Sequence, residues 1–356
     1  MTKKRKEPEQ RKPPIKPVKC IQLELFSDFV SNDKDTISNT VEFWESIPKY
    51  FFTPYQVEKL RTEKGHADPY EWSYTFNSIP CAVEIQPALI KQRDGGYKAF
   101  FPGVTEELVE EALKKILTDQ QYGIHDPEQP ETWVKFSLRM VAKELRDRGR
   151  TRSLDQIKHA IKVMSGCILT FYKDGKEIWQ GSILQDLLTS DREEYLKDSN
   201  SLHAARLPLF ISHAINQLEY RQFNYDRLMR CNDQLTRWIY KKLIHRYVNA
   251  NHNNDYHFSY SSLERDSGLL QQGRATDNRK KVIKALKELA SRDVLKEYVV
   301  EERKEGQKII DIIYTVRPSF NFVREQKAAN SRARDGLVKA GKKGTKPRQI
   351  TLEQTP

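Results

Sequence analysis

The sequence predicts an α+β protein, because one order of secondary-structure elements occurs twice along the chain. Each copy reads helix, strand, helix, helix and hairpin, and each strand ends in a similar tripeptide, KFS at 135–137 and HFS at 257–259. The apolar positions of the two last helices agree at a constant spacing of 125 residues, with Ile157, Ala160, Ile161 and Met164 matching Val282, Ala285, Leu286 and Leu289. Chance does not readily produce such a match, so we expect two tandem domains of one fold.

In the first copy, TEELVEEALKKILTD is an amphipathic helix for which Thr105 is the expected N-cap. WVKFS follows as a strand, after which Ser137 is expected to cap the helix LRMVAKELRDRG. Ser153 is expected to cap LDQIKHAIKVMSG. The next segment, CILTFYKDGKEIWQGSILQDL, reads as two strands around the turn dipeptide Asp174-Gly175.

In the second copy, NDQLTRWIYKKLIHRYV is a helix, YHFS a strand and SSLERDSGLL a short helix. Thr276 or Asp277 is expected to cap NRKKVIKALKELASRD, and residues 294–316 read as a hairpin with a glycine in its turn. This order is that of a winged helix, a helix-turn-helix followed by a β-wing. We place the domains at 81–200, including a hairpin at 81–103 around Gly95-Gly96, and at 201–323.

The flanking segments differ in composition from these domains. Residues 1–26 and 324–356 are rich in Lys and Arg, and they predict two disordered basic tails. The tails account for the formal net charge of +12, so residues 21–323 are balanced and any nucleic-acid contact must come from local segments. The aromatic-rich segment 27–80 is expected to pack onto the body, and the segment 186–218 reads as a long linker.

Composition also excludes several classes of protein. The four cysteines form no CxxC pair, which favours a reducing cytoplasm and argues against a disulfide framework or a zinc site. No apolar run is long enough for a membrane helix or a signal peptide. There is no GxxxxGK[ST] loop, no HxH pair and no carboxylate cluster with metal-site spacing. We therefore expect a cytoplasmic, nucleoid- or plasmid-associated protein that is not an enzyme and needs no cofactor or metal.

The charge of the body is segregated, and segregated charge usually faces a partner. Lys135 to Lys162 carries nine Lys and Arg against three acids, and Arg274 to Lys287 carries six against Asp277 alone. The compensating acid lies in TEELVEE (105–111) and DREEY (191–195).

In a helix-turn-helix the later helix lies in the major groove, so the cations there are candidate DNA contacts. Near the start of the second such helix, Arg279 suits guanine and Asn278 suits adenine. The other candidates suit phosphates: Arg148, Arg150, Arg152, Lys158, His159, Lys162, Arg274, Lys280, Lys284 and Lys287, with the wing cations Lys173, Lys176, Arg303, Lys304 and Lys308. For the first copy a dimer surface is the alternative.

One short motif near the N-terminus stands apart. QLELF supplies Gln22, Leu23, Leu25 and Phe26 in the Q-L-x-L-F form of the pentapeptide that bacterial replication proteins insert into the sliding clamp. A flexible tail could dock two apolar anchors and an aromatic ring into a pocket, while the glutamine amide makes a polar contact. The alternative is a short strand that pairs with the body.

The combination resembles the plasmid replication initiators with tandem winged helices, of the TrfA and RepA types. The resemblance runs from about residue 19 to residue 316 and includes QLELF, the hairpin and helix before the first copy, and FNYDRLMRCNDQLTRWIYKKL before the second. It implies binding to tandem origin repeats (iterons), melting of an adjacent AT-rich segment with single-stranded DNA as a further ligand, and recruitment of the host initiator, helicase and clamp. It also implies a monomer–dimer equilibrium that controls plasmid copy number.

Two other functions fit part of these observations. A winged-helix transcriptional repressor explains the two domains but not QLELF. A clamp-associated accessory protein explains QLELF but implies binding to DNA without sequence preference.

Overall fold

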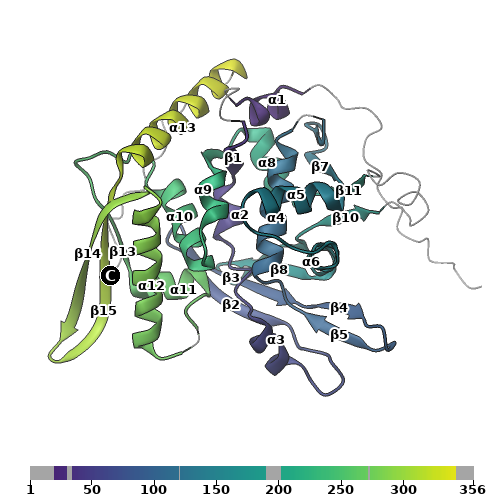
Figure 1. Cartoon of the computed structure of the whole chain (residues 1–356), viewed down its shortest axis with the longest axis horizontal. Coiled ribbons are helices and arrows are strands. Elements are labelled where there is room, and N and C mark those ends of the chain that lie inside the picture. Colours follow the sequence, from purple (N-terminus) through teal and green to yellow (C-terminus); the bar gives the residue numbers. More distant parts are fainter. Residues whose placement is uncertain (1–19, 30–33, 120, 190–201, 272, 342–356) are drawn as a thin grey trace, which may run out of the picture.

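Both predicted winged helices are present in the computed structural model, which describes residues 20–29, 34–119, 121–189, 202–271 and 273–341 (Figure 1). The second has the strand order β13-β15-β14 and buries the predicted stripe of its last helix, Val282, Ala285, Leu286 and Leu289. Its elements are α10 (Gln234–Arg246), β13 (Tyr256–Ser259), α11 (Tyr260–Ser267), α12 (Ala275–Ser291), β14 (Leu295–Glu305) and β15 (Lys308–Pro318).

The first winged helix repeats the same helices and strand. Ser137 and Ser259 occupy equivalent N-cap positions: their hydroxyl oxygens accept from the backbone N–H of Met140 at 3.2 Å and of Ser262 at 3.1 Å. The predicted duplication is therefore confirmed for the helices, for the strand and for the serine that follows the strand. The elements are α4 (Val104–Leu117), β7 (Glu131–Phe136), α5 (Leu138–Asp147), α6 (Leu154–Gly166), β8 (Ile168–Lys173) and β9 (Lys176–Ser182).

Two helix starts were predicted wrongly. The helix α4 begins after Gly103, whose N–H donates to the Glu106 carboxylate at 2.8 Å, and not after Thr105. The helix α12 begins after Arg274, which places Asp277 in its first turn. An acid there opposes the positive end of the helix dipole, so Asp277 stabilises the helix without capping it.

The sheet of the first winged helix departs from the expected wing. The strands β8 and β9 extend a hairpin of β2 (Tyr70–Phe76) and β3 (Ile79–Gln86), in the order β2-β3-β8-β9. A hairpin was predicted over residues 81–103, but around the glycines only β4 (Ala88–Lys91) and β5 (Tyr97–Phe100) pair with each other. Residues 81–86 belong to β3 and pair with β2 instead. The turn between those two strands is formed by Asn77 and Ser78, both at positive φ as a two-residue hairpin turn requires.

The predicted linker, 186–218, forms strands and a helix in its described parts, 186–189 and 202–218, and these belong to the first winged helix; residues 190–201 lie outside the described residues. The strand β7 pairs with β6 (Gly123–Asp126) on one side and with β11 (His203–Arg206) on the other, and β11 pairs with β10 (Gln185–Leu188). The helix α8 (Leu209–Gln217) packs against β7. The boundary predicted at residue 200 therefore lies too early, because pairing partners distant in sequence leave no local signal.

The aromatic-rich segment packs onto the body as predicted, with Trp44 fully buried. The strand β1 (Ile37–Thr40) pairs with β12 (Arg221–Asn224), so the N-terminal segment bridges to the second half of the chain. Three short helices complete this region: α2 (Glu42–Ser46), α3 (Pro54–Leu60) and α9 (Tyr225–Arg230). One continuous apolar core runs through both winged helices.

Both predicted tails, 1–26 and 324–356, include residues that are helical in the structure. Residues Ile21–Ser27 form the helix α1, and Phe320–Lys339 form the helix α13, which buries Phe322, Val323, Gln326 and Ala329. The buried residues of α13 recur at helical spacing, but the many lysines and arginines on its outer face obscured this pattern in the sequence. Residues 1–19 and 342–356 lie outside the described residues.

The four cysteines are free and buried, as the sequence predicted. In the part of the chain that the structure describes, no helix is long and apolar enough to cross a membrane.

Candidate nucleic-acid interface

The helix α12 presents a row of exposed cations on the face opposite its buried stripe. Arg274, Lys280, Lys284 and Lys287 all lie on this exposed face, as the sequence predicted. Lys284 contacts Asp233 at 2.8 Å, but its side chain is 70% exposed, so solvent screens the pair. Lys281, which was not among the predicted DNA contacts, is also exposed. The surface that a helix-turn-helix turns toward DNA is therefore cationic along its length.

Asn278 and Arg279, the two residues expected to read bases, are less exposed than the lysines of α12. Asn278 is 3% exposed and donates from Nδ2 to the carbonyl of Leu270 at 2.5 Å, so it closes the loop between α11 and α12 and is not free to contact adenine. Arg279 is half-buried. Burial raises the pKa of Tyr260 and Tyr314 to about 12, and the guanidinium of Arg279 lies close enough to oppose that rise. Arg279 thus lies at the junction of α12 and the wing.

The wing of the second winged helix carries mixed charge. Arg303, Lys304 and Lys308 are exposed near the turn between β14 and β15, as predicted. However, Lys304 contacts Glu302 at 2.9 Å, and Arg303 lies opposite Asp311 in the strand pair. These acids neutralise part of the positive charge of the wing.

In the first winged helix the exposed candidates are fewer. Lys158 and Lys162 lie on the outer face of α6, and Lys173 and Lys176 flank the β8–β9 turn. His159 is half-buried, with its ring 4.5 Å from that of Phe100, and burial lowers its pKa. The lowered pKa favours the neutral form of His159 at physiological pH, so it suits a phosphate less well than the neighbouring lysines do.

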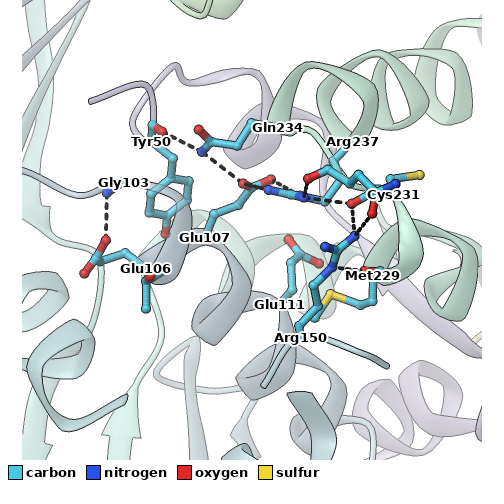
Figure 2. A network of polar contacts seen from close by, with 12 residues as sticks. Tyr50, Gly103, Glu106, Glu107, Glu111, Arg150, Met229, Cys231, Gln234 and Arg237 are labelled. Carbon is cyan, nitrogen blue, oxygen red and sulfur yellow. Dashed lines mark hydrogen bonds and ion pairs between the residues drawn. The ribbon is translucent and has the colours of Figure 1, made fainter. Parts of the chain in front are cut away.

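The three arginines before α6 have structural partners, which corrects their assignment to DNA. Arg150 donates from Nε to the carbonyl of Met229 at 2.6 Å and from Nη2 to that of Cys231, as Figure 2 shows. Arg148 donates to the carbonyl of Asp35 at 2.5 Å and also contacts Asp226. Arg152 is half-buried beside Thr105, with its Nε 3.3 Å from Oγ1. The contacts of Arg148 and Arg150 join the first winged helix to segments distant in sequence, whereas Arg152 contacts α4 of the same domain.

The acidic stretch of α4 does face a partner, and that partner is α10 of the same chain. Arg237 is 1% exposed and donates from Nε and Nη2 to the two carboxylate oxygens of Glu107, at 3.0 and 2.7 Å (Figure 2). Burial opposes ionisation of Glu107, but Arg237 outweighs it and lowers the pKa of this carboxyl. Further along the same interface, Lys241 contacts Glu111 and Glu45, each at 2.5 Å.

These buried pairs hold the first helices of the two winged helices against each other, and we call this contact the α4–α10 interface. A buried pair needs good geometry and full hydrogen bonding to repay its desolvation, so it is selective for one arrangement. The contact thereby relates α6 and α12 to each other in a defined orientation.

The QLELF segment is not exposed. It forms part of α1, in which Leu23, Leu25 and Phe26 are buried and Gln22 is half-buried. The ring of Phe26 meets that of Tyr220 edge-on at 4.8 Å. The segment is a helix packed on the body, so neither the exposed peptide nor the paired strand expected from the sequence describes it.

Over the described ranges, no cluster of His, Cys, Asp or Glu side chains could hold a metal ion. No protein-family model and no curated protein sequence matches the chain.

The solved structures that are similar to it include two of RctB and one of the Pi initiator protein. Domains 2 and 3 of RctB align as a selenomethionine derivative at 11% identity, a TM-score of 0.45, 74% of this chain and 95% of that one. A second crystal structure of these RctB domains aligns at 12% identity, a TM-score of 0.45, 76% of this chain and 97% of that one. The Pi initiator protein in complex with iteron DNA aligns at 13% identity, a TM-score of 0.43, 61% of this chain and 91% of that one. The winged-helix assignment rests on the strand order and helix packing described above.

Proposed function

We propose that this chain is a replication initiator that binds repeated double-stranded sequences at an origin. The observation that carries the proposal is the pairing of two winged helices in one chain, each with exposed lysines on the outer face of its last helix. Cations on that face are suited to phosphates flanking the major groove. Binding relies on these surfaces alone, without catalysis, cofactor or metal.

The α4–α10 interface gives the proposal a geometric consequence. Because buried ion pairs relate α6 to α12, both helices engage DNA as one unit and not as two independent readers. Each repeat then spans about 20 bp, or two helical turns. Within this role the protein opens an adjacent AT-rich segment and recruits the host initiator and helicase, and a monomer–dimer equilibrium limits copy number.

Recruitment of the sliding clamp through QLELF requires α1 to leave the body. Its three apolar anchors lose about 1.5–3 kcal/mol each when they are exposed. The clamp pocket would bury the same anchors again, so the body and the clamp compete for the segment.

The decisive experiment is a footprint of the purified chain on the DNA that flanks its own gene. The proposal expects protection that repeats about every 20 bp. One isolated protected palindrome would favour a transcriptional repressor of the same architecture. Protection that ignores sequence would favour a clamp-associated accessory protein.

A further inference from the structure

The second half of the helix α13 lies beside the end of the helix α1, near the top of Figure 1. Arg332 of α13 donates from Nη2 to the backbone carbonyls of Leu25 and Phe26, at 2.9 and 3.2 Å. The last carbonyls of any helix lack intrahelical partners, and a cation there also meets the negative end of the helix dipole. Arg332 therefore caps the C-terminal end of α1, although it lies more than 300 residues away in sequence.

Neighbouring contacts place Arg332 firmly over α1. Its Nη1 donates to Asn39 Oδ1 at 2.9 Å and to Gln222 Oε1 at 3.1 Å. Asn39 in turn donates from Nδ2 to the carbonyl of Phe26 at 2.5 Å. The guanidinium of Arg332 also lies 4.5 Å from the centre of the Phe29 ring. One side chain thus joins α13, β1, β12 and the end of the QLELF segment.

The two helices differ in how they are held. The first half of α13 is anchored by Phe322, Val323, Gln326 and Ala329, whereas Val338 near its end is 66% exposed. The helix α1 has seven residues, too few to persist as a helix without tertiary contacts. Loss of the Arg332 contacts would leave the carbonyls of its last turn without their charged donor, so α1 is the element that would detach.

We propose that α13 is a latch on the QLELF segment, and that Arg332 sets how often this segment is free to bind the clamp. The proposal rests on the clamp function proposed above. A segment that binds only when released has its apparent affinity reduced by the fraction of molecules in which it is free. The latch thereby keeps the clamp peptide hidden in most molecules.

The test compares the full-length chain with Arg332→Ala, and uses Arg334→Ala as the matched control, because Arg334 is exposed on the same helix. Amide hydrogen exchange over residues 21–27 reports release of α1 without any partner, and equilibrium binding to purified sliding clamp reports availability of the peptide. We expect Arg332→Ala to accelerate exchange in α1 about tenfold and to tighten clamp binding by a similar factor. Exchange in α10 should stay unchanged, and Arg334→Ala should match the wild type.

The two readouts separate failure of the latch from failure of the clamp proposal. Unchanged exchange in Arg332→Ala overturns the latch, whatever the clamp does. Faster exchange with equal clamp affinity removes its regulatory role. Faster exchange without clamp binding in any variant supports the latch and refutes the clamp function. If Arg332→Ala lowers the melting temperature of the whole chain, Arg332→Lys replaces it, since a lysine keeps the charge but cannot satisfy all four acceptors.

Discussion

Replacement of Arg237 by methionine should destabilise the protein strongly, because it leaves the Glu107 carboxylate buried without its cation. Both side chains are nearly inaccessible, and their bidentate contact has distances of 3.0 and 2.7 Å. Removing one partner of such a pair typically costs about 3–5 kcal/mol. Glu107 keeps a hydrogen bond from Gln234 at 3.1 Å, which places the expected loss near the lower end, about 3 kcal/mol.

Urea denaturation at pH 7 measures this loss, with the exposed Lys280→Met as a control that should stay within about 0.5 kcal/mol of the wild type. The double variant Glu107→Gln with Arg237→Met should recover most of the stability, because no unpaired charge remains. A single variant that loses under about 1 kcal/mol, or a double variant no better than the single, would refute the reasoning.

The pH dependence gives an independent check on the same pair. In the wild type the pKa of Glu107 is lowered from 4.5, so the pair stabilises the fold above that pH and the contribution is lost as the pH falls through the lowered value. In Arg237→Met the carboxylate is unpaired, and protonation relieves it. The difference in stability between the two proteins should therefore shrink as the pH falls toward 4.5 and below it.

Four further outcomes are expected. Lys287→Ala should weaken binding to all DNA alike and reduce the salt slope by about one, as a salt titration would reveal. Arg279→Ala should cost about 1–3 kcal/mol on the specific repeat and relax preference at one base pair, and equal loss on random DNA would count against this role. Asn278→Ala should lower stability by about 1–3 kcal/mol in urea without altering base preference, since it leaves the Leu270 carbonyl unpaired. Burial lowers the pKa of His125 from 6.5, so its neutral form stabilises the fold above that pH and the benefit is lost on acidification; His125→Gln should flatten this part of the stability profile.

Features whose causes lie within a few residues were predictable from sequence. Ser137, Ser153 and Ser259 cap helices because the hydroxyl and the N–H that it accepts lie three residues apart. Asp174 and Gly175 turn because both adopt positive φ. The exposed lysines of α12 follow from helical periodicity once the buried stripe is recognised. The duplicated order, and with it the fold class, is the sum of such local signals.

Whether a charged or apolar side chain is free was decided only by the tertiary structure. Arg150 and Lys287 are equally basic in sequence, yet Arg150 is committed to carbonyls about 80 residues away while Lys287 stays in solvent. The acidic stretch of α4 and the QLELF segment likewise resemble surfaces for partners in the sequence, yet side chains of α10 and α13 contact them in the fold. Hydrogen bonding and desolvation depend on which segments meet in space, and such distant pairing leaves no periodic trace in the chain.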